Sequence, residues 1–375
     1  MDPGKIYQFS PSKKSSFSRP TDSIYSQSVD GLYCPSLSNP DSFPNYGQSG
    51  FLEISNSGEL DMFSVDSSLN NVSRLARTQA GSKKLQQIIA KSRPEEIEKI
   101  VAHVAEIIGE LMIDKYGNYM CQTLVQSCSA AQRLKLLTGM KNSLVKISCD
   151  GKGTHALQNL IALANLHEEE QLYQQSFVGH IVKLSKDPNA SHVVQRLLVT
   201  VKNTYFIIKE LLGHVAELSM DKLGLCVIKK CVKNPQIFTE LLGSCLILMQ
   251  DPYGNYAIQE VLSTWREECG FEFVSSIQNK AAQLCIQKYA SNVMEKAMKV
   301  EVIRKAILRE LIVEDKLDLL MGSPYGCYVL KTAAIESDRE EKVELKKAFE
   351  LLGQKLHNSK LQSQWEEIFS IFREY

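Results

Sequence analysis

Between about residue 75 and residue 335, the chain repeats one pattern of apolar and polar positions. Each unit starts from a small residue, called here the register residue, which is followed by two variable, two apolar, two polar and two apolar positions. The second unit, residues 117–125, has the sequence GNYMCQTLV, and the sixth, residues 254–262, has GNYAIQEVL. Only the first unit departs, with Lys84 at an apolar position. The register residues follow one another at intervals of 30 to 37 residues: Gly81, Gly117, Gly153, Ala190, Gly224, Gly254, Ala290 and Gly326.

Helical geometry divides each unit into two faces. At about 100° per residue, the apolar positions 3, 4, 7 and 8 after the register residue share one side of a helix. Positions 1, 2 and 5 lie together on the other side, so we expect every unit to present three neighbouring side chains away from the core. Upstream segments, such as residues 143–148 and 180–185, are expected to form a preceding helix of the same unit. Because no unit can bury its apolar face alone, the sequence predicts an all-α solenoid of stacked units.

An Asp stands three residues before the register residue in five units. A carboxylate at this place can accept backbone N–H bonds, so we expect it to cap the start of the helix. These residues are Asp114, Asp150, Asp187, Asp221 and Asp251.

The first 70 residues differ in composition from the rest. They hold 17 Ser and 6 of the chain's 11 Pro, with 4 basic and 8 acidic residues. Such a segment has little periodic apolar content to offset the entropy of ordering, so we expect residues 1–57 to be a Ser/Pro-rich, disordered arm. The whole chain has 43 basic and 43 acidic residues, which excludes a uniformly basic nucleic-acid binder. Residues 71–375 carry a mild net charge of +4.

Composition and motifs also exclude several functional classes. No stretch approaches the roughly 18 to 20 apolar residues of a membrane helix. The ten Cys form no Cys-x-x-Cys pair, so we expect reduced thiols and neither a metal site nor a cofactor. The start of the chain lacks the basic and apolar regions of a signal peptide, and we expect a cytoplasmic protein. Cys121, Cys231 and Cys285 are expected to be small core residues.

One segment imitates an enzyme motif. Residues 151–156, GKGTHA, match a Gly-x-Gly-x-x-Ala dinucleotide-binding turn. A genuine turn lies between a strand and a helix, whereas the sequence on both sides continues the helical repeat. We therefore interpret Gly153 as a register residue and expect no catalysis and no small-molecule substrate.

The residues at positions 1, 2 and 5, called here the recognition triplet, give a more specific signal. Asn-Tyr-x-x-Gln, Ser-His-x-x-Gln and Ser-Asn-x-x-Glu, in roughly 36-residue units repeated eight times, resemble the Pumilio (PUF) family of RNA-binding proteins. The resemblance implies a curved α-solenoid of eight three-helix repeats at residues 58–335, with a weak N-terminal cap, and a C-terminal helical cap at residues 336–375. It also implies that each middle helix lines a concave surface that binds single-stranded RNA, one base per repeat.

The RNA-binding residues that the resemblance implies are the eight triplets. They are Ser82, Lys83, Gln86, Asn118, Tyr119, Gln122, Thr154, His155, Gln158, Ser191, His192, Gln195, Leu225, Cys226, Lys229, Asn255, Tyr256, Gln259, Ser291, Asn292, Glu295, Cys327, Tyr328 and Lys331.

The resemblance further implies a base for most repeats. Positions 1 and 5 would supply hydrogen-bonding groups to a base edge, and position 2 a flat group that stacks between bases. In the family, Asn with Gln corresponds to uracil, Ser or Cys with Gln to adenine, and Ser with Glu to guanine, and the last repeat meets the 5′ base. The triplets then imply an element close to 5′-U-G-U-n-A-A-U-A-3′, in which Ser291 and Glu295 meet the guanine.

Two repeats depart from the family's triplets. In the fifth, Leu225 cannot hydrogen-bond a base edge and Lys229 is only a donor, so we expect it to tolerate several bases or to contact phosphate. In the eighth, Cys327 and Lys331 replace the usual Asn and Gln, which puts its selectivity for uracil in question although Tyr328 can still stack.

The favoured hypothesis is a monomeric, sequence-specific RNA-binding protein without membrane contact. By the resemblance it would bind 3′ untranslated regions of mRNA and repress messages through deadenylation or translation-repression factors. One alternative is a helical-repeat scaffold for proteins, but a scaffold has no reason to hold base-recognising residues at fixed positions. The other is a divergent PUF relative in ribosome assembly with relaxed base selectivity, which the fifth and eighth repeats keep open.

Overall fold

The computed structural model describes residues 71–353 and 359–372, and the arm expected at residues 1–57 lies outside them. Every regular element in the described ranges is a helix, which confirms the all-α prediction. None of these helices combines the length and apolar character needed to cross a bilayer.

The helices follow one another in groups of three. The first helices of the groups are α3 (Val72–Ala76), α6 (Ile108–Ile113), α9 (Leu144–Cys149), α12 (Ile181–Ser185), α15 (Val215–Ser219), α18 (Cys245–Gln250), α21 (Ala281–Cys285) and α24 (Glu314–Met321). The middle helices are α4 (Gln79–Lys91), α7 (Gly117–Ser127), α10 (Gly153–Ala162), α13 (Ala190–Thr200), α16 (Gly224–Cys231), α19 (Gly254–Trp265), α22 (Ala290–Ala297) and α25 (Gly326–Glu336). The third helices are α5 (Pro94–Val104), α8 (Ala130–Met140), α11 (His167–Phe177), α14 (Tyr205–Leu211), α17 (Pro235–Gly243), α20 (Gly270–Ile277), α23 (Glu301–Leu311) and α26 (Arg339–Gly353). The described residues also form helix α27 (Ser359–Phe369) and the short 3-10 helices η2 (Lys141–Ser143), η3 (Arg266–Cys269) and η4 (Ser370–Phe372).

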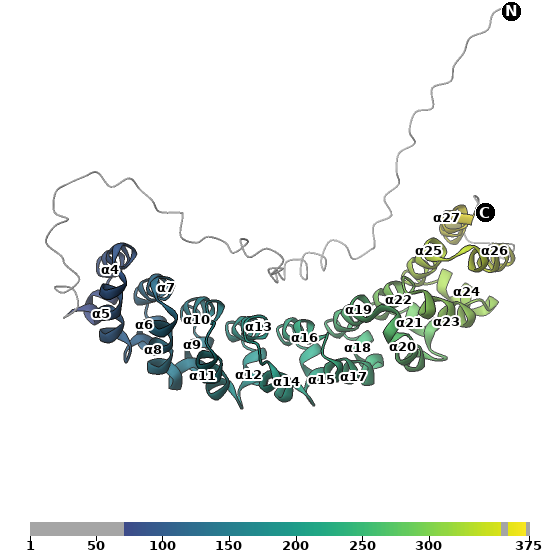
Figure 1. The fold of residues 1–375 in the computed structure, drawn as a ribbon. Coiled ribbons are helices and arrows are strands. Elements are labelled where there is room, and N and C mark those ends of the chain that lie inside the picture. The colour runs from purple at the N-terminus through teal and green to yellow at the C-terminus, as the bar shows by residue number, and fades with distance from the viewer. Residues whose placement is uncertain (1–70, 354–358, 373–375) are drawn as a thin grey trace, which may run out of the picture. The chain divides into compact units, whose positions relative to one another are not determined.

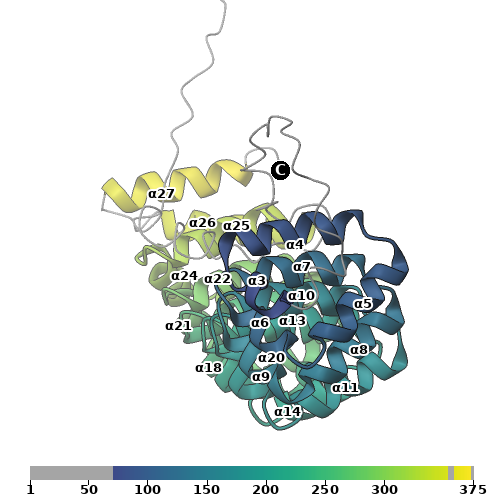
Figure 2. The ribbon, with the colours of Figure 1, turned by 90° about the vertical axis from the view of Figure 1, so that its left-hand side faces the viewer.

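The groups stack side by side into a curved row. Each middle helix packs against the middle helix of the next group, from α4 through to α25. Figure 1 shows the middle helices along the inner edge of the row and the third helices along its outer edge. Figure 2, turned by 90°, shows the row of helices from the end at which α4 and α5 lie. The triplets are therefore all carried by one edge of the solenoid.

The predicted Asp caps are confirmed. The backbone oxygen of Asp114 accepts the N–H of Asn118, and its Oδ1 accepts the N–H groups of Tyr116 and Gly117 at 2.9 and 2.8 Å. Burial by itself would raise the pKa of Asp114, but these N–H bonds, together with the charges of Arg77 and Lys152, hold that pKa below its usual range. The same pair of side-chain bonds recurs at the four other residues, Asp150, Asp187, Asp221 and Asp251.

The register residue is small because the preceding helix lies against it. A Cβ added to Gly117 would lie 2.8 Å from the backbone oxygen of Leu111, and one added to Gly326 would lie 2.5 Å from that of Leu320. After this contact, the apolar positions of each middle helix enter the core. In α7 they are Met120, Cys121, Leu124 and Val125, all fully buried. Cys231 and Cys285 are buried as well, as predicted.

Glutamates fasten the turns between groups. Glu210 on α14 accepts the backbone N–H groups of Gly179 and Ile181 at 2.6 and 3.0 Å, and Glu310 on α23 accepts those of Asn279 and Ala281, both at 3.0 Å. The carboxylates thus pair backbone N–H groups at turns that lie between two helices.

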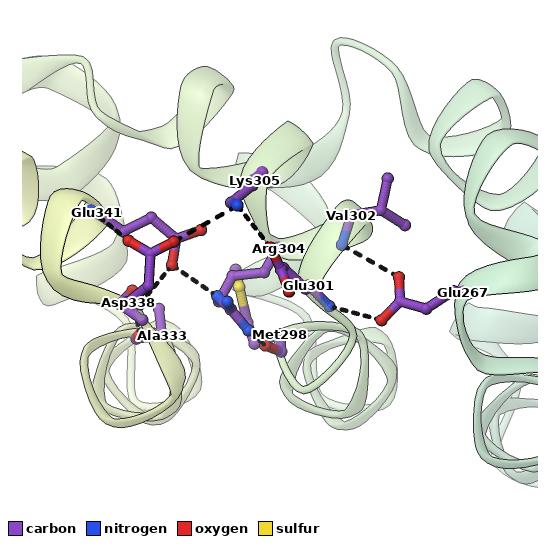
Figure 3. Close-up of polar contacts among 10 residues, drawn as sticks. Glu267, Met298, Glu301, Val302, Arg304, Lys305, Ala333, Asp338 and Glu341 are labelled. Carbon is purple, nitrogen blue, oxygen red and sulfur yellow. Dashed lines mark hydrogen bonds and ion pairs between the residues drawn. The ribbon is translucent and has the colours of Figure 1, made fainter.

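Two buried ion pairs join third helices of neighbouring groups. Arg133 on α8 donates to Glu169 on α11 at 3.3 Å, and Arg304 on α23 donates to Glu341 on α26 at 2.9 Å. Figure 3 shows that Arg304 also reaches the backbone oxygen of Met298, at 3.2 Å. In the same view, Glu267 accepts the N–H groups at the start of α23.

Candidate nucleic-acid interface

The recognition triplets occupy equivalent places on the first turns of successive middle helices. Position 1 and position 5 are one helical turn apart, and position 2 lies beside them. Because neighbouring middle helices pack side by side, the triplets form one continuous strip along the inner edge of the row (Figure 1).

The exposure of the strip differs from the sequence prediction at position 1. We expected all three residues of a triplet to face away from the core, but every residue at position 1 is between 0% and 7% exposed. Position 2 ranges from half-buried to exposed, as in Tyr119 at 56%, and position 5 is mostly half-buried. The prediction that position 1 is presented away from the core together with positions 2 and 5 was therefore wrong.

The neighbouring repeat explains the burial of position 1. The Oγ of Ser82 donates to the backbone oxygen of Tyr116 at 2.7 Å, just before α7 begins. The Oγ1 of Thr154 donates in the same way to the oxygen of Asn189, just before α13. The periodicity of a single helix gives no information about a neighbouring repeat, so the sequence did not predict this contact.

In four repeats, position 5 donates a hydrogen bond to position 1 of the same helix. The glutamine Nε2 atom lies 2.9 to 3.3 Å from the oxygen at position 1. The pairs are Gln86 with Ser82, Gln122 with Asn118, Gln158 with Thr154, and Gln259 with Asn255. In these four repeats, positions 1 and 5 therefore form one polar unit.

The helix cap fixes the orientation of the asparagine in this unit. The Nδ2 of Asn118 donates to the backbone oxygens of Asp114 and Lys115 at 2.9 and 3.1 Å. Asn255 makes the equivalent bonds to Asp251 and Pro252, both at 2.9 Å. The amide oxygen of each Asn then accepts from its Gln. The Gln amide keeps its own oxygen and a second N–H, so it can both accept from and donate to one ligand.

Flat side chains dominate position 2. It holds tyrosine in three repeats (Tyr119, Tyr256 and Tyr328) and histidine in two adjacent repeats (His155 and His192). Burial of the His192 ring, followed by the charge of His155, lowers the pKa of His192. Two imidazole rings from adjacent helices are suited to hold a planar ring between them.

The fifth and eighth repeats lack the bond between positions 1 and 5. Leu225 has no polar side-chain atom, and Cys327 accepts a weak hydrogen bond from Gln364 of α27 at 3.9 Å. Their position-5 lysines form ion pairs instead with glutamates on the helix that follows along the inner edge of the row. Lys229 on α16 pairs with Glu260 on α19 at 3.0 Å, and Lys331 on α25 pairs with Glu367 on α27.

The sequence that forms this arrangement matches a model of a known protein family. The model described as "Pumilio-family RNA binding repeat" matches residues 108–138, 180–212, 214–236, 244–269, 280–312 and 319–343. The chain belongs to the Pumilio family. The six matched segments cover the second, fourth, fifth, sixth, seventh and eighth groups. The count of eight Pumilio repeats stays a prediction that rests on the shared helix register.

Relatives and solved structures agree with this Pumilio assignment. The chain is 35% identical over 276 residues to Pumilio homolog 12 of Arabidopsis thaliana, covering 70% of this chain and 46% of that protein. It is 27% identical over 299 residues to Pumilio homolog 9 of the same plant, covering 76% and 53%. The chain thus spans about half the length of the curated relatives it matches. It is also similar to the solved structure of a Puf4 RNA binding domain bound to an HO endonuclease RNA 3′ UTR recognition sequence, with a TM-score of 0.71, 28% identity, and coverage of 78% of this chain and 97% of that one.

The Pumilio fold brings all 24 predicted residues onto one strip, but their contact with RNA stays a prediction. The sequence analysis missed Glu260, Glu367 and Gln364, which contact the fifth and eighth triplets. Glu260 stands at position 6 of its own unit, beside the triplet, and this place was the available signal. Residues 151–156 do not form a dinucleotide-binding turn, because α9, which precedes them, is a helix rather than a strand, and Gly153 begins α10.

Proposed function

We propose that this protein binds single-stranded RNA along the strip of recognition triplets, one base per repeat. The observation that carries the proposal is the bonded pair of positions 1 and 5, which recurs in the same place on α4, α7, α10 and α19. A scaffold for proteins gains nothing from an amide held in one orientation beside an exposed aromatic ring. The similar Puf4 domain, at 28% identity, is bound to RNA in its solved structure.

The finer proposal concerns the RNA sequence and its consequence. The orientation of Gln122 and Gln259 offers one acceptor and one donor, which suits the N3–H and carbonyl groups of uracil. Glu295 offers only acceptors, which suits the N1–H and N2–H₂ donors of guanine. With the family's assignments for the other repeats, the element is close to U-G-U-n-A-A-U-A in the 3′ untranslated regions of messages. The protein would act there as a cytoplasmic, monomeric post-transcriptional repressor that recruits deadenylation or translation-repression factors and needs no catalysis.

Selection of RNA from a random pool by the full chain tests the proposal. We expect enriched sequences to share a U-G-U trinucleotide followed by an A/U-rich segment. Enrichment of sequences without a G-U step would refute the base assignments, and failure to enrich any RNA would refute the function and favour the scaffold. An enriched motif with little preference beyond one or two bases would instead favour the relative with relaxed selectivity.

A matched pair of variants links the selected RNA to the strip. Gln122→Ala with Gln259→Ala removes two edge contacts, and each loss should cost on the order of 1–3 kcal/mol of binding free energy. Gln171→Ala is the control, because Gln171 lies exposed on the third helix α11, where it contacts His167. Equal affinities of the double variant and the control would place the RNA elsewhere on the protein.

A further inference from the structure

The two repeats that break the triplet pattern share a second feature. Both have lysine at position 5, and each lysine forms an ion pair with a glutamate on the next helix of the row. Lys229 on α16 lies 3.0 Å from Glu260 on α19, with the two side chains 41% and 34% exposed. Lys331 on α25 pairs with Glu367 on α27, and these side chains are 39% and 40% exposed. In both repeats, an ion pair with a neighbouring helix therefore stands in place of the bond between positions 1 and 5.

The chemistry of position 1 explains why the lysine turns to its neighbour. In four of the six other repeats, the position-5 amide donates to an oxygen at position 1 of its own helix. Leu225 offers no acceptor, and the Cys327 sulfur already accepts from Gln364 at 3.9 Å. An ammonium group is donor-only and needs an acceptor. The carboxylate of the following helix provides one, so the polar unit spans two helices where it otherwise lies within one.

The pairing changes what these lysines can do to a nucleic acid. An unpaired lysine beside a single-stranded RNA neutralises a phosphate and releases counterions, which strengthens binding to every sequence. A lysine and a carboxylate about 3 Å apart have no net charge as a pair, so a phosphate gains little by approaching them. A phosphate that displaced Glu260 would also come to lie beside a free carboxylate, and like charges repel.

We propose that Glu260 and Glu367 are specificity-determining residues that keep Lys229 and Lys331 away from the RNA phosphates. The fifth and eighth repeats then add little sequence-independent affinity, and the six regular triplets dominate the choice of RNA. The proposal rests on the proposed RNA-binding function. It decides between the two roles that the sequence left open for the fifth repeat, in favour of weak base selection without phosphate contact.

Salt dependence of binding tests the proposal directly. The probes are an RNA enriched in the selection and a scrambled RNA of equal length and composition. In Glu260→Gln with Glu367→Gln, both lysines are freed. The slope of log K against log salt should become steeper by about 1.4, because each phosphate contact on a single strand contributes about 0.7. Affinity for the scrambled RNA should rise more, as a ratio, than affinity for the enriched RNA.

A quadruple variant separates this effect from a general loss of negative charge. When Lys229→Met and Lys331→Met are added to the two glutamate changes, the slope should return to that of the wild type. If the quadruple variant keeps the steeper slope, the glutamates act only by repelling RNA, and the proposal is wrong. An unchanged slope in the double glutamate variant overturns it as well.

A matched ion pair elsewhere serves as the control. Glu98 and Lys135 lie on the adjacent third helices α5 and α8, 3.1 Å apart and similarly exposed, but on the outer edge of the row. Glu98→Gln should leave the salt slope unchanged. A wild-type protein that binds neither RNA would refute the proposed function, whereas binding with equal slopes in all variants would refute this inference alone.

Discussion

A change of base preference at the seventh repeat is the strictest test of the recognition strip. The perturbation is Ser291→Asn together with Glu295→Gln, which gives α22 the position-1 and position-5 residues of α7 and α19. Ser291 is 1% exposed and donates to the backbone oxygen of Lys288 at 3.3 Å. The introduced asparagine amide can donate to that same oxygen and to the oxygen of Gln287, as Asn255 does to Pro252 and Asp251.

The structure indicates how large the effect should be. In the wild type, the acceptor-only carboxylate of Glu295 matches guanine and faces two repelling carbonyls on uracil. In the variant, the introduced amide pair should adopt the orientation seen in Gln259 and Asn255, which offers one donor and one acceptor. Each mismatched edge contact costs on the order of 1–3 kcal/mol, or roughly 5- to 150-fold in affinity. Since the preference reverses, the ratio of guanine to uracil affinities should change by about the square of that factor.

The assay is competition binding of the full chain against two RNAs that differ only at the second base of the element. The converse variant, Asn255→Ser with Gln259→Glu, should change the preference at the third base from uracil to guanine. Unchanged helix content in the far-UV spectrum shows that each variant is folded. If both folded variants keep the wild-type preferences, positions 1 and 5 do not contact bases, and the reasoning is refuted.

Three further predictions concern stability, pH and the arm. Arg304→Met should destabilise the C-terminal repeats by about 3–5 kcal/mol, because Glu341 stays buried without its partner, and adding Glu341→Gln should recover most of the loss. Urea unfolding followed by Trp365 fluorescence measures the stability of both variants. Equal stabilities of the wild type and Arg304→Met would contradict the prediction. Because the pKa of His192 is lowered in the folded protein, protonation favours the unfolded chain, so stability should fall as the pH drops below about 6.5. The contribution of His192 to this pH dependence of stability should be absent from His192→Gln. Identical pH profiles of stability for the wild type and this variant would contradict the prediction. Deleting residues 1–57 should change RNA affinity less than twofold, since all triplets lie beyond them, and a large loss in a binding titration would show that the arm contacts RNA.

Much of the fold follows from the sequence because it depends on local rules repeated many times. The spacing of apolar positions fixes which side of each middle helix is buried, and the Asp three residues before the register residue ends one helix and begins the next. The short preceding helices, such as α9 and α12, were predictable from the same register. Even α3, which precedes the first register residue, is present although only a weak N-terminal cap was expected there.

What the sequence could not provide are the contacts between repeats. The burial of Ser82 and Thr154 depends on the backbone oxygens of Tyr116 and Asn189, which lie more than 30 residues away. The pairing of Lys331 with Glu367 depends on α27 following α25 in the row. Each of these contacts links residues whose proximity arises only from stacking, and periodicity within one helix contains no information about them.

The contacts within one repeat support the selectivity that we propose for a formally neutral chain. The asparagines at position 1 donate to the turn that caps their helix, so their oxygens accept from the position-5 glutamines in one orientation. That turn is in turn held by the Asp cap and by the close approach of Gly117 or Gly254 to the preceding helix. A recognition group whose orientation is already fixed loses less entropy when a ligand binds, and it penalises a mismatched edge fully because it cannot rotate to accommodate it. The base selectivity that we propose for the strip therefore depends on the same bonds that define the repeat.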